Sequence, residues 1–147
     1  MPTSRPSGTR SAASSTSKPP EPLVFFVDES LDSLTVVEAL RAAGATVERL
    51  TEHFPKGTAD ETWLAHAGSK RWVVFTRDKR IRYRQLERLA LKEARVRAFV
   101  FTGGNVTVKD TAAILLSALR RIETICRADA GPFIYHIGRT GKPIRMD

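Results

Sequence analysis

The sequence predicts an α/β fold: a three-layer α/β/α sandwich around a mainly parallel, roughly five-stranded sheet. Three observations predict it. Short, mostly apolar runs recur at residues 23–27, 72–75, 96–101 and 133–137, and continuous apolar runs are typical of parallel strands buried on both faces. Between them lie segments whose apolar residues are spaced by three or four, as in amphipathic helices. Turn-forming residues separate the two kinds of segment, so strands and helices alternate.

The first part of the predicted domain reads as strand, helix and strand. After the strand at 23–27, Ser33 is placed to cap a helix that Gly44 ends. Residues 46–50 form the second short strand. Pro55 and Gly57 then favour a loop over a helix.

The next helix carries an apolar stripe over residues 63–67. Thr58 or Asp60 is expected to cap its start, and Gly68 to end it. The third strand follows at residues 72–75.

Three further elements complete the sheet and its helices. An amphipathic helix is expected over residues 86–94 and leads to the fourth strand at 96–101. The longest helix runs from about 110 to 127, and the fifth strand covers 133–137. The chain then turns back into a short antiparallel edge strand through Ile144 and Met146.

The composition predicts one soluble domain with a polyanionic partner. A chain of 147 residues with 41% hydrophobic and 27% charged residues suits a single globular domain. Its net charge of +8 favours nucleic acid. Cys126 is the only cysteine, which excludes an internal disulfide and a cysteine-based zinc site. No apolar run approaches the roughly 20 residues of a membrane span, and no secretory signal is evident, so the cytoplasm is the expected location and no membrane partner is expected.

The amino-terminal 22 residues differ in composition from the remainder. They are rich in Ser, Pro and basic residues, and Glu21 is their only acid. Such a segment cannot bury enough apolar surface to offset its ordering entropy. We expect a disordered basic tail at residues 1–22 and a folded domain at 23–147. A transit peptide is the alternative interpretation of this composition.

Carboxylates follow two strands and begin one helix. Asp28 and Glu29 end the first strand, Asp78 follows the third, and Asp60 and Glu61 start the helix after the second. Carboxyl ends of parallel strands share one sheet edge, where ligands bind. Oxygen ligands suit a hard cation such as Mg²⁺, which activates a bound water. Acids in a first helical turn also stabilise the helix dipole, so the choice between Asp60 and Glu61 stays open.

Cations are concentrated around the third strand. Eleven of the 24 basic residues fall between positions 70 and 97, with three acids among them. We expect RNA contacts from the run that begins at this strand's end, namely Arg77, Lys79, Arg80, Arg82 and Arg84. A solvated charged face is the alternative. Tyr83 could stack on a base.

Three segments resemble the acidic motifs of PIN-like domains: residues 25–29, 60–64 and 73–79. The resemblance covers most of residues 23–137. The Thr-Gly-Gly-Asn loop at 102–105 and the Gly-Pro-Phe-Ile sequence at 131–134 resemble the compact PIN-like group found in bacterial toxins of the VapC type. Residues 23–147 are thus expected to form a PIN-like nuclease domain.

This resemblance implies a Mg²⁺- or Mn²⁺-dependent endoribonuclease. Such an enzyme hydrolyses RNA phosphodiester bonds with metal-activated water, and is often the toxin of a toxin–antitoxin pair and a homodimer. RNA and an antitoxin protein are the implied partners. Residue by residue, Asp28, Asp60 or Glu61, and Asp78 match the family's catalytic metal ligands.

The sequence departs from the family pattern at a fourth acid. Asn105 occupies the loop where many PIN nucleases place an Asp, and Glu29 compensates if its side chain turns inward. Thr76 and Thr102 are also expected near the site. The departure leaves a second hypothesis open, a catalytically weak or silent RNA-binding module.

A phosphoacceptor receiver domain is a third hypothesis. It also needs acids after the first and third strands, and Thr102 fits its threonine. It further requires a lysine after the fifth strand, where this chain offers His136 or Gly138. That mismatch disfavours the receiver reading. His53, His66 and His136 lack metal-ligand spacing and are not expected to bind a metal.

Overall fold

A six-stranded sheet is the centre of the molecule. The computed structural model describes residues 22–78 and 85–146. The strands are β2 (Val24–Val27), β3 (Thr46–Arg49), β4 (Val73–Thr76), β5 (Arg97–Phe101), β6 (Phe133–Ile137) and β7 (Pro143–Arg145). Their order across the sheet is β3-β2-β4-β5-β6-β7. Only β7, among the described strands, pairs antiparallel. The mainly parallel sheet and its antiparallel edge strand are therefore confirmed.

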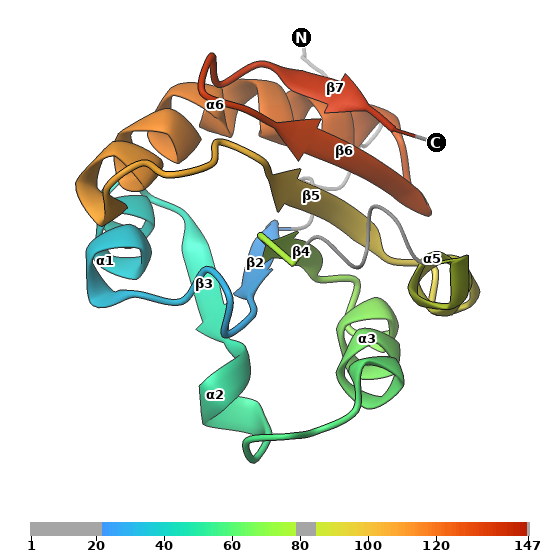
Figure 1. Ribbon diagram of the computed structural model, residues 1–147. Helices are drawn as coiled ribbons and strands as arrows, with labels where there is room; N and C mark the ends of the chain where they lie inside the picture. The colour runs from blue at the N-terminus through green and yellow to red at the C-terminus, as the bar shows by residue number, and fades with distance from the viewer. Residues whose placement is uncertain (1–21, 79–84, 147) are drawn as a thin grey trace, which may run out of the picture.

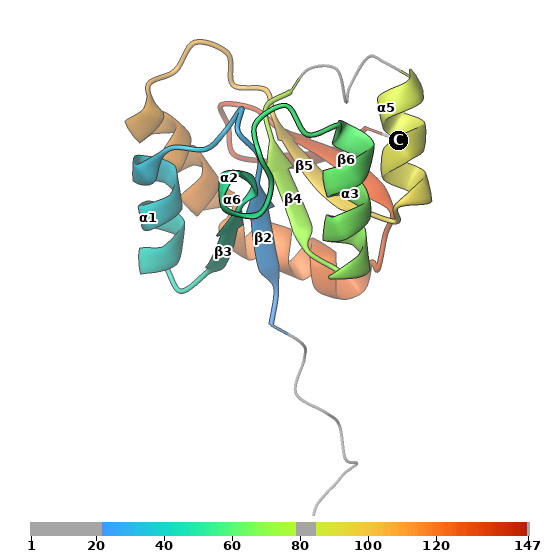
Figure 2. The ribbon, with the colours of Figure 1, turned by 90° about the horizontal axis from the view of Figure 1, so that it is seen from below.

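Helices cover both faces of this sheet (Figures 1 and 2). They are α1 (Leu34–Ala42), α2 (Leu50–His53), α3 (Asp60–Ser69), α5 (Gln85–Glu93) and α6 (Val108–Ala128). One apolar core joins α1 and α6 to the sheet through residues such as Leu40, Phe99 and Ile122. The other lies under α3 and α5 and includes Leu64 and Leu91. The predicted α/β/α layers follow from these two cores.

Two long-range alignments in the sheet place the site. Phe25 pairs with Val73 and Val27 with Phe75, so β2 and β4 end at the same level. The residues after them, which include Asp28 and the segment 77–78, therefore emerge side by side. This is the carboxyl edge, where open α/β sheets place ligands.

The expected start of α1 is confirmed. The Ser33 hydroxyl accepts a hydrogen bond from the Val36 N–H at 3.1 Å, and Gly44 lies just after the helix with φ of +94°. Thr107 likewise caps α6 by accepting from the Asp110 N–H at 3.0 Å. Each cap satisfies one of the N–H groups that a helix start leaves without an intrahelical partner.

The expected cap of α3 is wrong. Ala59 occupies the cap position and makes no side-chain cap bond, so neither Thr58 nor Asp60 caps the helix. Thr58 instead donates its hydroxyl to the Pro55 carbonyl at 2.6 Å. Asp60 is the first helical residue, and its carboxylate accepts from the Trp63 indole N–H at 3.1 Å. The sequence contains several side chains that are able to cap this helix. In the structure the Thr58 hydroxyl is bonded within the preceding turn and does not cap it.

The expected role of Gly68 is also wrong. The helix continues to Ser69, so Gly68 lies inside α3. A Cβ added there would lie 1.9 Å from the Ala94 carbonyl oxygen. Gly68 therefore allows α3 to pack directly against the end of α5.

The second strand is shorter than predicted. It ends at Arg49, and Leu50 begins the four-residue helix α2, which the sequence pattern did not indicate. Leu50 is buried in the core beneath α3, beside Trp63. No helix among residues 22–78 and 85–146 is long and apolar enough to cross a membrane.

Candidate active site

A pocket of about 460 Å³ opens at the carboxyl edge of the sheet. Four of the five predicted site carboxylates, Asp28, Glu29, Asp60 and Asp78, line it together. The full lining is Asp28, Glu29, Ser30, Leu50, Asp60, Trp63, Arg77 and Asp78. Segments separated by up to 50 positions in the chain thus meet in one concave site.

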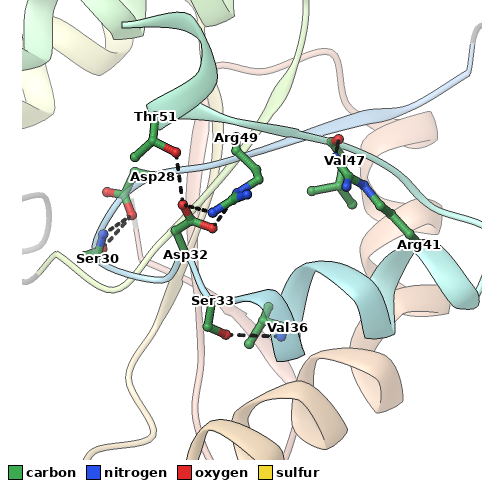
Figure 3. Close-up of polar contacts among 9 residues, drawn as sticks. All are labelled: Asp28, Ser30, Asp32, Ser33, Val36, Arg41, Val47, Arg49 and Thr51. Carbon is green, nitrogen blue, oxygen red and sulfur yellow. Dashed lines mark hydrogen bonds and ion pairs between the residues drawn. The ribbon is translucent and has the colours of Figure 1, made fainter. Parts of the chain in front are cut away.

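Asp28 is the most enclosed of these acids. It follows β2 directly, and the residue is only 4% exposed. Its backbone N–H donates to the Phe75 carbonyl at 3.1 Å, which joins it to β4. One carboxylate oxygen accepts from the Ser30 N–H at 3.1 Å and from the Ser30 hydroxyl (Figure 3). The other accepts from the Thr76 hydroxyl, so both oxygens are held.

Burial raises the pKa of Asp28 from 3.8 to about 6. Hydrogen bonds from Ser30 and Thr76 oppose this effect by stabilising the carboxylate, and the negative charge of Asp78 adds to it. The site thus holds an ionised Asp28 at neutral pH with its negative charge poorly compensated. A cation in the pocket would relieve that cost.

Ser30 and Thr76 tie the two strand ends together. Their hydroxyl oxygens lie 3.1 Å apart. Ser30 also accepts from the Arg77 N–H at 2.9 Å, and Thr76 accepts from the Asp78 N–H at 3.0 Å. Thr76, which the sequence suggested near the site, lies beside Asp28 and donates its hydroxyl to that carboxylate. Sequence reasoning missed Ser30, for which the only signal was a hydroxyl two residues after Asp28.

Asp60 and Glu61 diverge at the start of α3. Asp60 is partly buried and lines the pocket, where its bond to the Trp63 indole restrains it. Glu61 is exposed and is not among the lining residues. Glu29 lines the pocket with an exposed side chain. Of the two open candidates, the structure thus brings Asp60 to the pocket.

Arg77 connects the pocket to the loop after β5. Its guanidinium donates to the Gly104 carbonyl at 3.0 Å and lies over the Phe101 ring at 5.3 Å. The predicted RNA contacts Lys79, Arg80, Arg82 and Arg84 lie outside the described residues, as does Tyr83. Arg77 is therefore the described member of that run at the site.

The residues expected near the site after β5 lie outside the pocket lining. Asn105 is exposed, and Thr102 is half-buried with its hydroxyl 3.5 Å from the His136 ring nitrogen. The neighbouring carbonyl of Gly103 accepts from Arg139 at 2.7 Å. Two arginines, Arg77 and Arg139, thus hold this loop by its backbone.

An ion pair supports the segment that carries Asp28. Asp32 accepts from the Arg49 Nε at 2.9 Å and from a second guanidinium nitrogen at 3.0 Å, and Thr51 donates to it at 3.2 Å (Figure 3). This joins the loop after β2 to the β3–α2 junction. The Asp32 side chain is 8% exposed, which limits screening by solvent.

The pocket is not a preassembled metal centre. In the described part of the chain, no three His, Cys, Asp or Glu side chains are grouped closely enough to hold a metal ion. Four carboxylates nevertheless line the pocket, those of Asp28, Glu29, Asp60 and Asp78, and hard cations prefer such oxygen ligands. Mg²⁺ keeps several waters and uses only one or two carboxylates directly. The donor set fits such a hydrated cation.

Comparison with known families decides the class of this fold. The sequence model of the PIN like domain matches residues 23–103, which contain all three pocket aspartates. The chain belongs to the PIN-like domain family. The match covers more than half of the chain and spans β2 to β5.

A mycobacterial relative extends the similarity of this PIN-like chain. The protein named "Putative ribonuclease VapC45" from Mycobacterium tuberculosis (strain ATCC 25618 / H37Rv) is 29% identical over 117 residues. The aligned region covers 77% of this chain and 84% of that protein. No solved structure matches the chain significantly. The resemblance to VapC-type proteins seen in the sequence motifs is thus supported by this relative.

Proposed function

We propose that this PIN-like protein is a metal-dependent endoribonuclease that hydrolyses RNA phosphodiester bonds. The observation that carries the proposal is the meeting of Asp28, Asp60 and Asp78 in one pocket of a PIN-like domain. The name of the mycobacterial relative supports RNA as substrate. The net charge of +8 favours a polyanion.

The three aspartates would hold Mg²⁺ or Mn²⁺, with Glu29 at the rim of the pocket. When bound, the metal supplies a water of lowered pKa and compensates charge on the phosphodiester. Asp28 is the fixed member because Ser30 and Thr76 hold both of its oxygens. Its raised pKa means that cation binding must compete with a proton below about pH 6.

Arg77 is positioned to receive a phosphate group. It lines the pocket, and one of its N–H groups bonds to Gly104. A guanidinium carries five N–H donors, so it retains capacity for a phosphate oxygen. We assign it to RNA binding, together with the basic run that follows it in the sequence.

The proposal extends to a toxin–antitoxin system in the cytoplasm. It is supported by the similarity to a VapC-named protein and by the compact PIN-like domain. An antitoxin protein is the partner that this assignment requires. The homodimer remains a prediction that no contact of the described residues tests.

A second candidate function is a catalytically weak RNA-binding module. It is favoured by Asn105, which replaces an expected acid and is exposed outside the pocket lining. Both functions share the RNA partner and differ in cleavage.

Asp78→Asn separates the two functions. The change keeps the size of the side chain and removes its negative charge. With Mg²⁺ or Mn²⁺ present, the ribonuclease proposal expects the wild type to cleave RNA and the variant to lose about a hundredfold or more of that rate. Equal cleavage by both proteins would rule out this site. RNA binding without cleavage by the wild type would favour the silent module.

A further inference from the structure

A second and larger pocket lies at the opposite edge of the sheet. Its volume is about 690 Å³, and its lining comes from the amino ends of β2, β4 and β5 together with the ends of α3 and α6. In Figure 2 the amino end of β2 lies on the lower side of the view, beside the carboxyl end of α3. The four residues of β4 separate the two sheet edges by roughly 13 Å. This pocket is therefore separate from the acidic one.

The charge of this second pocket is strongly positive. Its lining includes Lys70, Arg71, Arg97 and Arg127, and no acidic side chain belongs to it among the described residues. The carboxyl ends of α3 and α6 point to the same edge, and each contributes roughly half a negative charge. The three exposed cations Lys70, Arg71 and Arg127 alone outweigh these dipoles by about two charges. Neutralisation of the negative carboxyl ends of α3 and α6 therefore does not account for all of the pocket cations.

Arg97 supplies a fixed charge at the base of the pocket. It is 6% exposed, and its guanidinium donates to the Arg71 carbonyl at 2.6 Å and to the Cys126 carbonyl at 3.3 Å. A charge held in such a low-dielectric place acts more strongly than one in water. Burial raises the pKa of Cys126 to about 11, so its thiol stays neutral at physiological pH. The thiol therefore adds no negative charge to the pocket, and Glu123 and Asp129, which act on it electrostatically, lie outside the lining.

We propose that this basic pocket is a second anion site, which holds a phosphate group of RNA away from the acidic pocket. The inference rests on the proposed function for the identity of its ligand. Guanidinium and ammonium groups are the usual phosphate ligands. The pocket volume also lies in the range of small-ligand sites. Contact at this edge would tether RNA independently of cleavage.

The backbone offers a matched control for a test. Arg71 ends the α3 turn with φ of +58°, and Arg95 occupies the same left-handed position after α5 with φ of +60°. The same two helix-ending bonds occur at both places: the N–H of Arg71 bonds the Gly68 carbonyl and that of Trp72 the Ala67 carbonyl, and the N–H groups of Arg95 and the residue after it bond in the same way. Glycine relieves the strain equally at both places. Arg95 is not among the residues that line the basic pocket.

The test compares two double variants with the wild type. Arg71→Gly/Arg127→Gln removes two pocket cations. The control Arg95→Gly/Arg121→Gln removes the cation after α5 and an exposed cation on α6, neither of which lines the pocket. Binding of a fluorescent single-stranded RNA is measured by anisotropy, without divalent metal, over a range of salt. Urea denaturation checks that both variants fold.

The pocket variant should show a weaker salt dependence. Each lost phosphate contact reduces the slope of log K against log salt by about 0.7 for single strands, so two contacts reduce it by about 1.4. Between about 50 and about 200 mM salt, the pocket variant should lose roughly sevenfold less affinity than the wild type. The control variant should keep the wild-type slope. Equal slopes in the two double variants would overturn the inference.

Competition distinguishes RNA from a free nucleotide. Adenosine monophosphate and inorganic phosphate are titrated against the bound RNA. Displacement only at far higher concentration than unlabelled RNA supports the assignment to RNA, whereas displacement by the nucleotide at equal affinity overturns it. Because binding is measured without metal, failure of cleavage would contradict the ribonuclease proposal and leave this measurement intact.

Discussion

Asp28→Asn should stabilise the metal-free protein at neutral pH. Burial raises the pKa of Asp28 to about 6 from 3.8, which means that the folded state favours the protonated form. As the pH rises, this carboxyl ionises near pH 4 in the unfolded chain but only near pH 6 in the folded protein. The free energy of unfolding of the wild type therefore falls between about pH 4 and pH 6. Above pH 6 this fall in the free energy of unfolding amounts to roughly 3 kcal/mol. A neutral amide avoids this loss.

The gain expected from Asp28→Asn is about 1–3 kcal/mol, because the amide must also fit the hydroxyls of Ser30 and Thr76. Urea denaturation in a chelator at several pH values measures it. The variant and the wild type should differ least near pH 4 and most above pH 6. Glu29→Gln, which changes an exposed neighbour, should leave the profile unchanged. The reasoning would be refuted if the stability gain of Asp28→Asn over the wild type were no larger at pH 7.5 than at pH 4.

Three further predictions concern Gly68, Arg77 and the binding of Mg²⁺. Gly68→Ala should destabilise the protein by about 3 kcal/mol or more, measured by urea denaturation, because its Cβ would meet the Ala94 carbonyl oxygen. Arg77→Lys should raise the KM for RNA several-fold and lower the free energy of unfolding by about 1 kcal/mol, because lysine lacks the planar fork that bonds the Gly104 carbonyl and lies over Phe101. Mg²⁺ affinity measured by calorimetry should fall about tenfold per pH unit below about pH 6, where Asp28 takes up a proton; a flat profile would contradict this.

The fold was largely predictable from local pattern. Buried parallel strands such as β4 are continuous apolar runs, and α6 shows a long three-and-four spacing. Helix α2 was missed because four residues are too few to show a period. The role of Gly68 was also missed, since it depends on contact with Ala94, which lies 26 positions away.

The candidate site was predictable in its acids and not in their support. Parallel topology places Asp28 and Asp78 at one sheet edge from sequence alone. Asp60 could not be separated from Glu61, because both suit a first helical turn and the orientation of α3 against the sheet decides which of them lines the pocket. Ser30 likewise gained its role from strand pairing, which brings it to Thr76.

The most direct test of the account is RNA cleavage by the adjacent variants Asp60→Asn and Glu61→Gln, with Mg²⁺ or Mn²⁺ present. Each removes one negative charge from the first turn of α3, but of these two residues only Asp60 lines the acidic pocket. We predict that Asp60→Asn loses most of the cleavage rate, whereas Glu61→Gln keeps a rate close to that of the wild type. Equal rates in the two variants, or loss only in Glu61→Gln, would contradict the acidic pocket as the active site.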